Sequence, residues 1–162
     1  MIEFFEYAAI ALPDMLAGTW VTLEVTFGAL FIGLFIGLPM ALIRIYGARW
    51  LQPFCTAYLT VFRGTPLLVQ LFVVYYGLPE LGISFSRMAA AFFTLGCHSA
   101  AYQCEYFRGA IMSVSQGQMK AARGIGMSRL SAIRYIVLPQ ALRLVIPAWS
   151  NEFIAMIKYT AV

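Results

Sequence analysis

Long apolar stretches separated by short polar segments run through almost the whole chain. Four of them are candidates for membrane-crossing helices, at about 15–43, 54–78, 88–107 and 142–162. A helix rises about 1.5 Å per residue and the bilayer core is about 30 Å thick, so about 20 apolar residues are enough to cross it. The pattern therefore predicts a single all-α membrane domain over residues 1–162, with a polar loop at about 108–141.

Glycines and a proline interrupt the first two stretches. Gly28, Gly33 and Gly37 lie in the first. They either form a face that packs closely on another helix or reflect the higher glycine content of membrane helices. In the second stretch, Pro66 lacks an N–H group and its ring collides with the preceding turn, which predicts a kink or break near it. The connection at 77–85 is short, so the second and third spans are expected to be antiparallel neighbours.

The composition agrees with a membrane protein. Hydrophobic residues make up 62% of the chain and charged residues 11%, whereas soluble domains are about half apolar and a quarter charged. Three cysteines in apolar sequence fit neither a disulfide framework nor a paired metal pattern. We expect no metal ligands and no catalytic residues, and we interpret the single histidine, His98, as a hydrogen-bonded core residue.

The charges are distributed unevenly, and their distribution predicts the orientation of the chain. Residues 1–24 contain four acidic residues and no lysine or arginine, while residues 108–143 contain six basic residues and no acid. Because basic residues near the ends of spans favour the cytoplasmic side, the loop is expected inside and the amino terminus outside.

The polar loop has the signals of two short helices joined by a glycine turn. Residues 118–124 read as the first helix, and Ser115 and Gly117 before it are candidate cap or turn residues. Ser128 can cap a second helix, which we expect to end before Pro139. A fixed knob of this kind can transmit a rigid-body movement from a docked soluble partner. The small pair Ala121-Ala122 is expected to let that partner approach closely.

The spacing within this loop resembles the cytoplasmic coupling loop of binding-protein-dependent ABC importer permeases. That loop reads Glu-Ala-Ala, three residues, Gly, nine residues, Ile, one residue, Leu-Pro. The matching residues here are Lys120, Ala121, Ala122, Gly126, Ile136, Leu138 and Pro139. Lys120 replaces the acid of the family pattern. The string Arg63-Gly64-Thr65-Pro66-Leu67-Leu68-Val69-Gln70 is also similar to the second span of the polar amino-acid branch, which includes histidine, glutamine and arginine permeases.

The resemblance implies a fold and a division of labour. The expected fold is the helical bundle of a type I ABC importer transmembrane domain, with about four of the usual five spans present and the chain truncated at its carboxyl end. The chain would be a permease subunit that imports polar amino acids, not an enzyme, and needs no cofactor, because ATP and Mg²⁺ are bound by a partner ATPase. The loop at 117–139 would couple to that ATPase. The coupling residues implied are Gly117, Gln118, Lys120, Ala121, Ala122, Arg123, Gly126, Met127 and Ser128.

The other partners implied are a second permease subunit, identical or different, and a periplasmic or extracellular solute-binding protein. The expected location is the bacterial plasma membrane, as a multi-pass protein among its lipids, and no nucleic acid is expected to bind.

Ionisable and polar groups at membrane depth mark candidate positions on the substrate pathway. These candidates are Arg63, Glu105, Asn151, Glu152 and Lys158. Simpler interpretations stand beside this one. Arg63 and Arg108 can extend to the membrane boundary, and Glu105 can pair with Arg108 three residues later on the same helix. Glu152, predicted near mid-membrane, either contacts substrate or pairs with another span.

Two other function classes fit the sequence less well. An ion-coupled secondary carrier or channel subunit is the main alternative, but such carriers often contain inverted repeats, and none is evident here. A membrane enzyme would need a catalytic cluster, which one histidine and scattered acids do not provide. The sequence also lacks the GxxxxGK[ST] phosphate-binding loop, so an ATP-driven function requires a separate energy-supplying chain.

Overall fold

The computed structural model describes residues 2–114 and 116–160, and the side-chain surroundings within 10–114 and 117–160. Ser115 and the last two residues of the fourth predicted span lie outside the described residues. The described chain is helical throughout, with short connections. Its α-helices are α1 (Ile2–Tyr46), α2 (Gln52–Gly64), α3 (Leu67–Phe72), α4 (Arg87–Ser113), α5 (Gln116–Gly124), α6 (Arg129–Ala132) and α7 (Leu138–Thr160). Two π-helical turns, η1 (Val73–Gly77) and η3 (Ile133–Val137), and one 3₁₀ turn, η2 (Leu78–Leu81), complete it.

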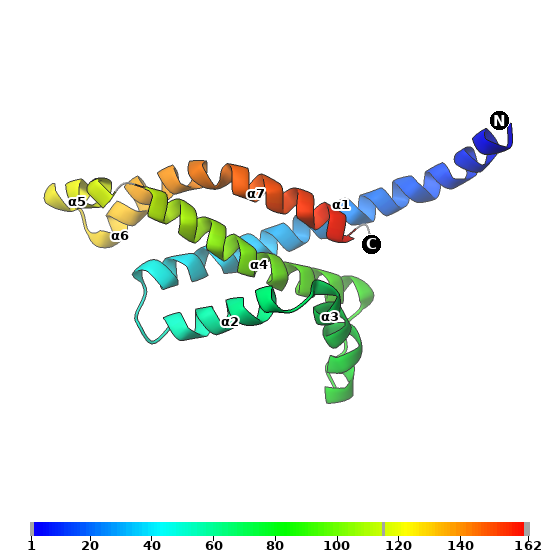
Figure 1. Ribbon diagram of the computed structural model, residues 1–162, viewed down its shortest axis with the longest axis horizontal. Helices are drawn as coiled ribbons and strands as arrows, with labels where there is room; N and C mark the ends of the chain where they lie inside the picture. The colour runs from blue at the N-terminus through cyan, green and yellow to red at the C-terminus, as the bar shows by residue number, and fades with distance from the viewer. Residues whose placement is uncertain (1, 115, 161–162) are drawn as a thin grey trace.

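The central element is α4, which contacts α1, α2, α3 and α7 (Figure 1). Ser86 starts this helix, because its hydroxyl accepts a hydrogen bond from the backbone N–H of Ala89 at 3.3 Å. The residues in the middle of α4 are small and fully buried, as Ala100 and Ala101 show. The predicted adjacency of the second and third spans is confirmed, since both parts of the second span contact α4.

The glycines of α1 lie against α4. A Cβ atom added to Gly37 would fall 2.8 Å from the carbonyl oxygen of Ala100 and 3.0 Å from the backbone N of Cys104. A Cβ at Gly33 would come within 2.9 Å of the hydroxyl of Ser99. Such distances are too short for real carbon atoms, so the two backbones approach closely only because these positions have no side chain. Of the two interpretations from sequence, the helix-contact face is confirmed.

The second span is broken at the predicted place. The helix axis turns by 104° between α2 and the segment that starts at Leu67, so the predicted kink is a sharp bend. The side-chain amide of Gln70 donates to the carbonyl oxygens of Phe62 and Thr65, at 2.8 and 3.0 Å, and to the hydroxyl of Thr65 at 2.8 Å. Gln70 thereby supplies donors to carbonyls that the end of α2 leaves without helical partners.

Length and composition single out two of the described helices as candidate membrane spans, residues 10–46 and 129–160, and a third if the bent α2–α3 pair is one span. The third predicted stretch, 88–107, forms most of α4, but α4 is not among these candidates. Its polar residues are largely covered by neighbouring helices, as Ser99 and Gln103 show at 0% exposure. The four-span count stays a prediction.

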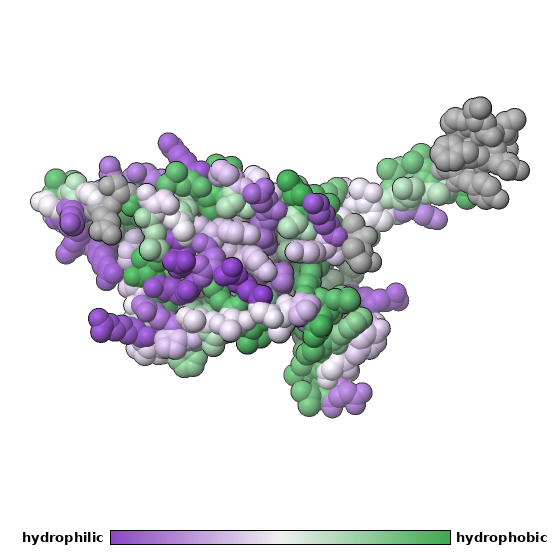
Figure 2. All heavy atoms as spheres, viewed as in Figure 1, coloured by the Kyte–Doolittle hydropathy of each residue, from purple (hydrophilic) through white to green (hydrophobic). Residues whose placement is uncertain are grey.

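Hydrophobic and hydrophilic residues are distributed unevenly over the surface. Figure 2 shows hydrophobic residues over α3 and the turns that follow it, and hydrophilic residues over the middle of the molecule and toward the end formed by α5 and α6. Large apolar side chains of α1 also face outward, among them Trp20 and Phe31, which are 71% and 62% exposed. A surface of this kind is suited to lipid rather than to water.

Candidate functional site

The basic loop begins with the predicted helix, which α5 forms. Its end is fixed by a glycine turn, because Gly126 has a left-handed φ of +88°. The N–H of Gly126 donates to the carbonyl of Arg123, and the N–H of Met127 to that of Ala122, both at 3.1 Å. This pattern is a Schellman motif, which satisfies the last carbonyls of a helix and favours glycine at the left-handed position.

The second loop helix starts as predicted but ends differently. The hydroxyl of Ser128 accepts a hydrogen bond from the N–H of Ser131 at 3.1 Å and caps α6. The expected end before Pro139 is wrong, because α6 continues through η3 into α7 as one helical segment. The wider π-helical turn, in which the N–H of Leu138 bonds to the carbonyl of Ile133, lies directly before the proline. It gives the ring room that a regular α-helical turn would not provide.

Most of the predicted coupling residues face outward. Gly117, Gln118, Lys120, Ala121, Arg123, Gly126 and Ser128 are exposed, and Met127 is half-buried. Ala122 is the exception: it is 4% exposed and faces this chain. Of the small pair, Ala121 is therefore the residue that is open to a partner, and the expected close approach of a partner stays a prediction. Sequence reasoning missed Ile125 and Leu130, which are 81% and 75% exposed. Both are isolated apolar residues in a basic loop, and this pattern could have indicated that they are exposed.

Arginines from three helices surround Glu105. The predicted pair with Arg108 is confirmed, with Nη2 of Arg108 2.7 Å from Oε2 of Glu105. The other carboxylate oxygen accepts a hydrogen bond from Arg44 at the end of α1, and Nη1 of Arg63 lies 3.9 Å from it. One carboxylate thus joins α1, α2 and α4. Glu105 therefore serves to connect helices and is not an unpaired charge on a substrate pathway. Sequence reasoning missed Arg44.

Glu152 is buried between α7 and α4, with 3% of its surface exposed. One carboxylate oxygen accepts a hydrogen bond from the hydroxyl of Ser99 at 2.9 Å, and the other accepts one from Tyr106 at 3.3 Å. No cation pairs with Glu152 among the described residues. Its neighbours Asn151 and Lys158 on α7 are exposed instead. The structure does not bring the three α7 candidates together at one site.

Further buried polar groups lie along α4 near Glu152. The amide of Gln103 donates to the carbonyl of Leu30 at 3.0 Å, and its oxygen accepts from the indole N–H of Trp149 at 2.9 Å. Nδ1 of His98 lies 3.3 Å from Oε1 of Gln70, which confirms His98 as a hydrogen-bonded core residue. These contacts tie the polar side of α4 to α1, α3 and α7. Sequence reasoning missed Gln103, because an amide in an apolar run gives no sign of its partners.

Apolar outer surfaces, a polar central helix and an exposed, rigid basic knob together define the membrane subunit of a transporter. The chain belongs to the family of binding-protein-dependent transport system inner membrane components, which matches residues 10–162. It is 39% identical to the probable amino-acid permease protein YxeN of Bacillus subtilis, with 97% of this chain and 71% of that protein covered. It is 38% identical to the probable amino-acid ABC transporter permease protein PatM of Vibrio harveyi, with 97% and 72% covered.

Solved structures agree with this assignment. The crystal structure of an amino acid ABC transporter with histidines matches with a TM-score of 0.87 and 38% identity, covering 97% of this chain and 73% of that one. An inward-facing MetNI methionine ABC transporter matches with a TM-score of 0.79 and 24% identity over 92% of this chain and 72% of that one, which shows the shared fold.

These findings confirm the predicted class. The chain is a membrane protein with the fold of a type I ABC importer transmembrane domain, and it is a transport subunit rather than an enzyme. The alternative of an ion-coupled secondary carrier is not favoured.

Proposed function

We propose that this chain is the permease subunit of an ATP-driven importer of polar amino acids in a bacterial plasma membrane. It works with ATP-binding subunits, a second permease subunit and an extracellular solute-binding protein. ATP and Mg²⁺ belong to the ATP-binding subunits, and this chain needs no cofactor of its own. Support for the substrate class comes from relatives and a solved structure named as amino-acid transporters. The basic loop lies in the cytoplasm and the amino terminus outside, in accord with the charge asymmetry.

The observation that carries the coupling role is the knob formed by α5, the turn at Gly126 and α6. The turn between its two helices is fixed by the Schellman motif that ends α5 and by the Ser128 cap that starts α6, while Ile125 and Leu130 stay exposed. Rigid backbone and exposed apolar side chains suit a surface that docks on a soluble partner and transmits its movement.

Replacing Gly126 with valine tests this role. A β-branched residue with a left-handed φ costs about 1–2 kcal/mol, so the turn opens and the knob loses its fixed shape. We expect less co-expressed ATP-binding subunit to co-purify with the variant, and little ATP-driven uptake in proteoliposomes. The control is Gly124→Val, two residues earlier in α5, where an added Cβ meets no atom within 4 Å. Equal losses in both variants would contradict a specific role for the turn.

Among the predicted substrate-pathway residues that the structure describes, Glu152 is the acid that is buried and has no cation as a partner. We propose that it contacts the charged part of an amino-acid substrate. Replacing it with glutamine keeps the shape but removes the charge. We expect uptake of a cationic amino acid to fall at least about tenfold, the loss of one charge-assisted hydrogen bond. Transport by purified complexes in proteoliposomes is the measurement. Glu80→Gln, at an exposed acid in η2, is the control, and unchanged uptake in Glu152→Gln would rule out the contact.

A further inference from the structure

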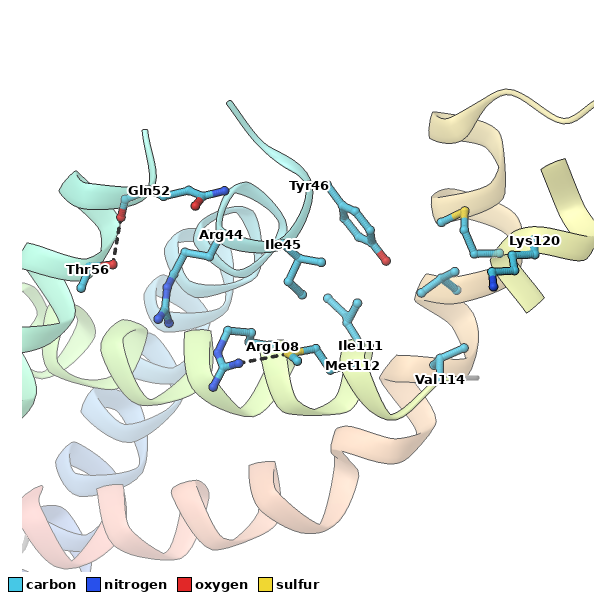
Figure 3. A pocket seen from close by; sticks show the side chains of 12 residues that line it. Arg44, Ile45, Tyr46, Gln52, Thr56, Arg108, Ile111, Met112, Val114 and Lys120 are labelled. Carbon is cyan, nitrogen blue, oxygen red and sulfur yellow. Dashed lines mark hydrogen bonds between the residues drawn. The ribbon is translucent and has the colours of Figure 1, made fainter. Parts of the chain in front are cut away.

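A cavity of about 630 Å³ lies where the end of α1, the start of α2, the end of α4 and α5 meet (Figure 3). Its volume falls within the range of small-molecule sites, which is about 300–1,000 Å³. Three cations line it: Arg44 from α1, Arg108 from α4 and Lys120 from α5. Its lining residues include no aspartate or glutamate. The cavity therefore has the charge of an anion site.

The positive charge of this cavity is only partly neutralised. Glu105, just outside the lining, pairs with both Arg44 and Arg108 and lies 3.9 Å from Arg63. One carboxylate thus faces three arginines. Lys120 makes no hydrogen bond or ion pair with any described residue, so its three donors are available. A further cation, Arg129, lies over the ring of Tyr46 at 5.3 Å, and Tyr46 also lines the cavity.

The neutral part of the lining combines two kinds of surface. Tyr46 and Gln52 provide a hydroxyl and an amide group, which can donate to anionic oxygens. The hydroxyl of Thr56 also lines the cavity, but it already donates to the carbonyl of Gln52 at 3.0 Å. The apolar part is larger and consists of Ile45, Ile111, Met112, Val114, Met119 and Val137. Figure 3 shows Lys120 across the cavity from Arg44 and Arg108. An anion held here would lie between charged donors on opposite sides of the cavity, and the apolar side chains would contact any hydrocarbon attached to it.

We propose that this cavity binds the phosphate of an anionic membrane lipid. A lipid headgroup and a free phosphate ion share the phosphate group, and a cluster of arginine and lysine donors recognises its oxygens. The lipid is favoured over a free phosphate because the apolar walls would cover glycerol and acyl carbons, and because the end of α1, a candidate membrane span, forms part of the lining. Basic pockets between transmembrane helices are known to suit lipid headgroups.

Lys120 extends the positive charge to the wall across the cavity from Arg44 and Arg108 (Figure 3). An acid at this position would instead offset the charge of those arginines and weaken the attraction for an external anion.

Native mass spectrometry of the full chain, purified in detergent with the subunits that co-purify, tests the proposal. Phosphatidylglycerol and phosphatidylcholine of equal chain length are added in parallel. We expect the unmodified protein to retain one molecule of phosphatidylglycerol in preference to phosphatidylcholine. Lys120→Gln should lower that retention about three- to tenfold, the value of one charge-assisted contact in a partly exposed site. Lys120→Glu should lower it further.

The control is Arg143→Gln, which removes an exposed cation of α7 that does not line the cavity. It should leave retention unchanged. Equal retention of the two lipids, or equal losses in Lys120→Gln and Arg143→Gln, would overturn the proposal. Soluble glycerol phosphate is added as a competitor at the same concentration as the lipid. Displacement of the lipid would assign the site to a free phosphate and overturn the lipid assignment, whereas continued retention supports it.

Discussion

Replacing Gln70 with leucine is expected to lower the free energy of unfolding by about 2–3 kcal/mol. The Gln70 amide donates to two carbonyls and one hydroxyl at the 104° bend. Its oxygen faces Nδ1 of His98. Leucine has a similar volume but no polar atoms, so these part-buried groups lose their partner, and each such loss costs about 1–3 kcal/mol before allowance for exposure. Thermal unfolding of the purified protein in detergent measures the effect.

The matched control is Gln140→Leu. Gln140 is exposed, and among the described residues its amide bonds to the carbonyl of Ile136 alone, on its own helix, at 2.8 Å. We expect this variant to melt within a few degrees of the unmodified protein. If the two glutamine variants melt at the same temperature, Gln70 does not hold the bend.

Replacing Gly37 with alanine is expected to destabilise the α1–α4 contact by about 1–3 kcal/mol, which is the usual cost of adding a group to a packed interior. The new Cβ would meet the backbone of Ala100 and Cys104. Backbone atoms cannot move aside as a flexible side chain can, so α1 and α4 must separate along this face. The measurement is again the unfolding transition in detergent, together with the yield of folded protein from the membrane.

Gly18→Ala on the same helix is the control for this substitution. An added Cβ at Gly18 meets no atom within 4 Å, and alanine favours a helix over glycine by up to about 1 kcal/mol. We therefore expect Gly18→Ala to be neutral or slightly stabilising. A loss of stability in Gly18→Ala as large as that in Gly37→Ala would show that close helix contact is not the cause.

The basic loop was the part of the candidate site most accessible from sequence. Glycine and serine carry their structural meaning locally, so Gly126 and Ser128 could be placed in a turn and a helix cap before any packing was known. The orientation of Ala122 could not be predicted in this way. Neighbouring alanines in a helix point in different directions, and which of them is covered depends on where the rest of the chain lies.

The charged side chains show the same division between what can be predicted locally and what depends on packing. Glu105 and Arg108 are three residues apart on one helix, and their pair was predicted and found. Arg44 is 61 residues from Glu105 in sequence, and its contact arises only because α1 packs along α4. Glu152 was predicted to contact either substrate or another span. Its hydrogen bonds to Ser99 and Tyr106 are contacts with another span, and the substrate contact stays a proposal.

The sequence by itself determined the all-helical membrane class, the break at Pro66, the glycine turn of the loop and the family. Each of these follows from residues close together in the chain, where hydrophobic spacing and backbone preference act. The tertiary structure decided that α4 is the enclosed polar centre, that Gln70 serves the bend, and that Arg44, Arg108 and Lys120 share one cavity. These features depend on helix packing, which brings together groups that are distant in sequence. A periodic apolar pattern shows which face of a helix is buried, but not which residue of another helix it will contact.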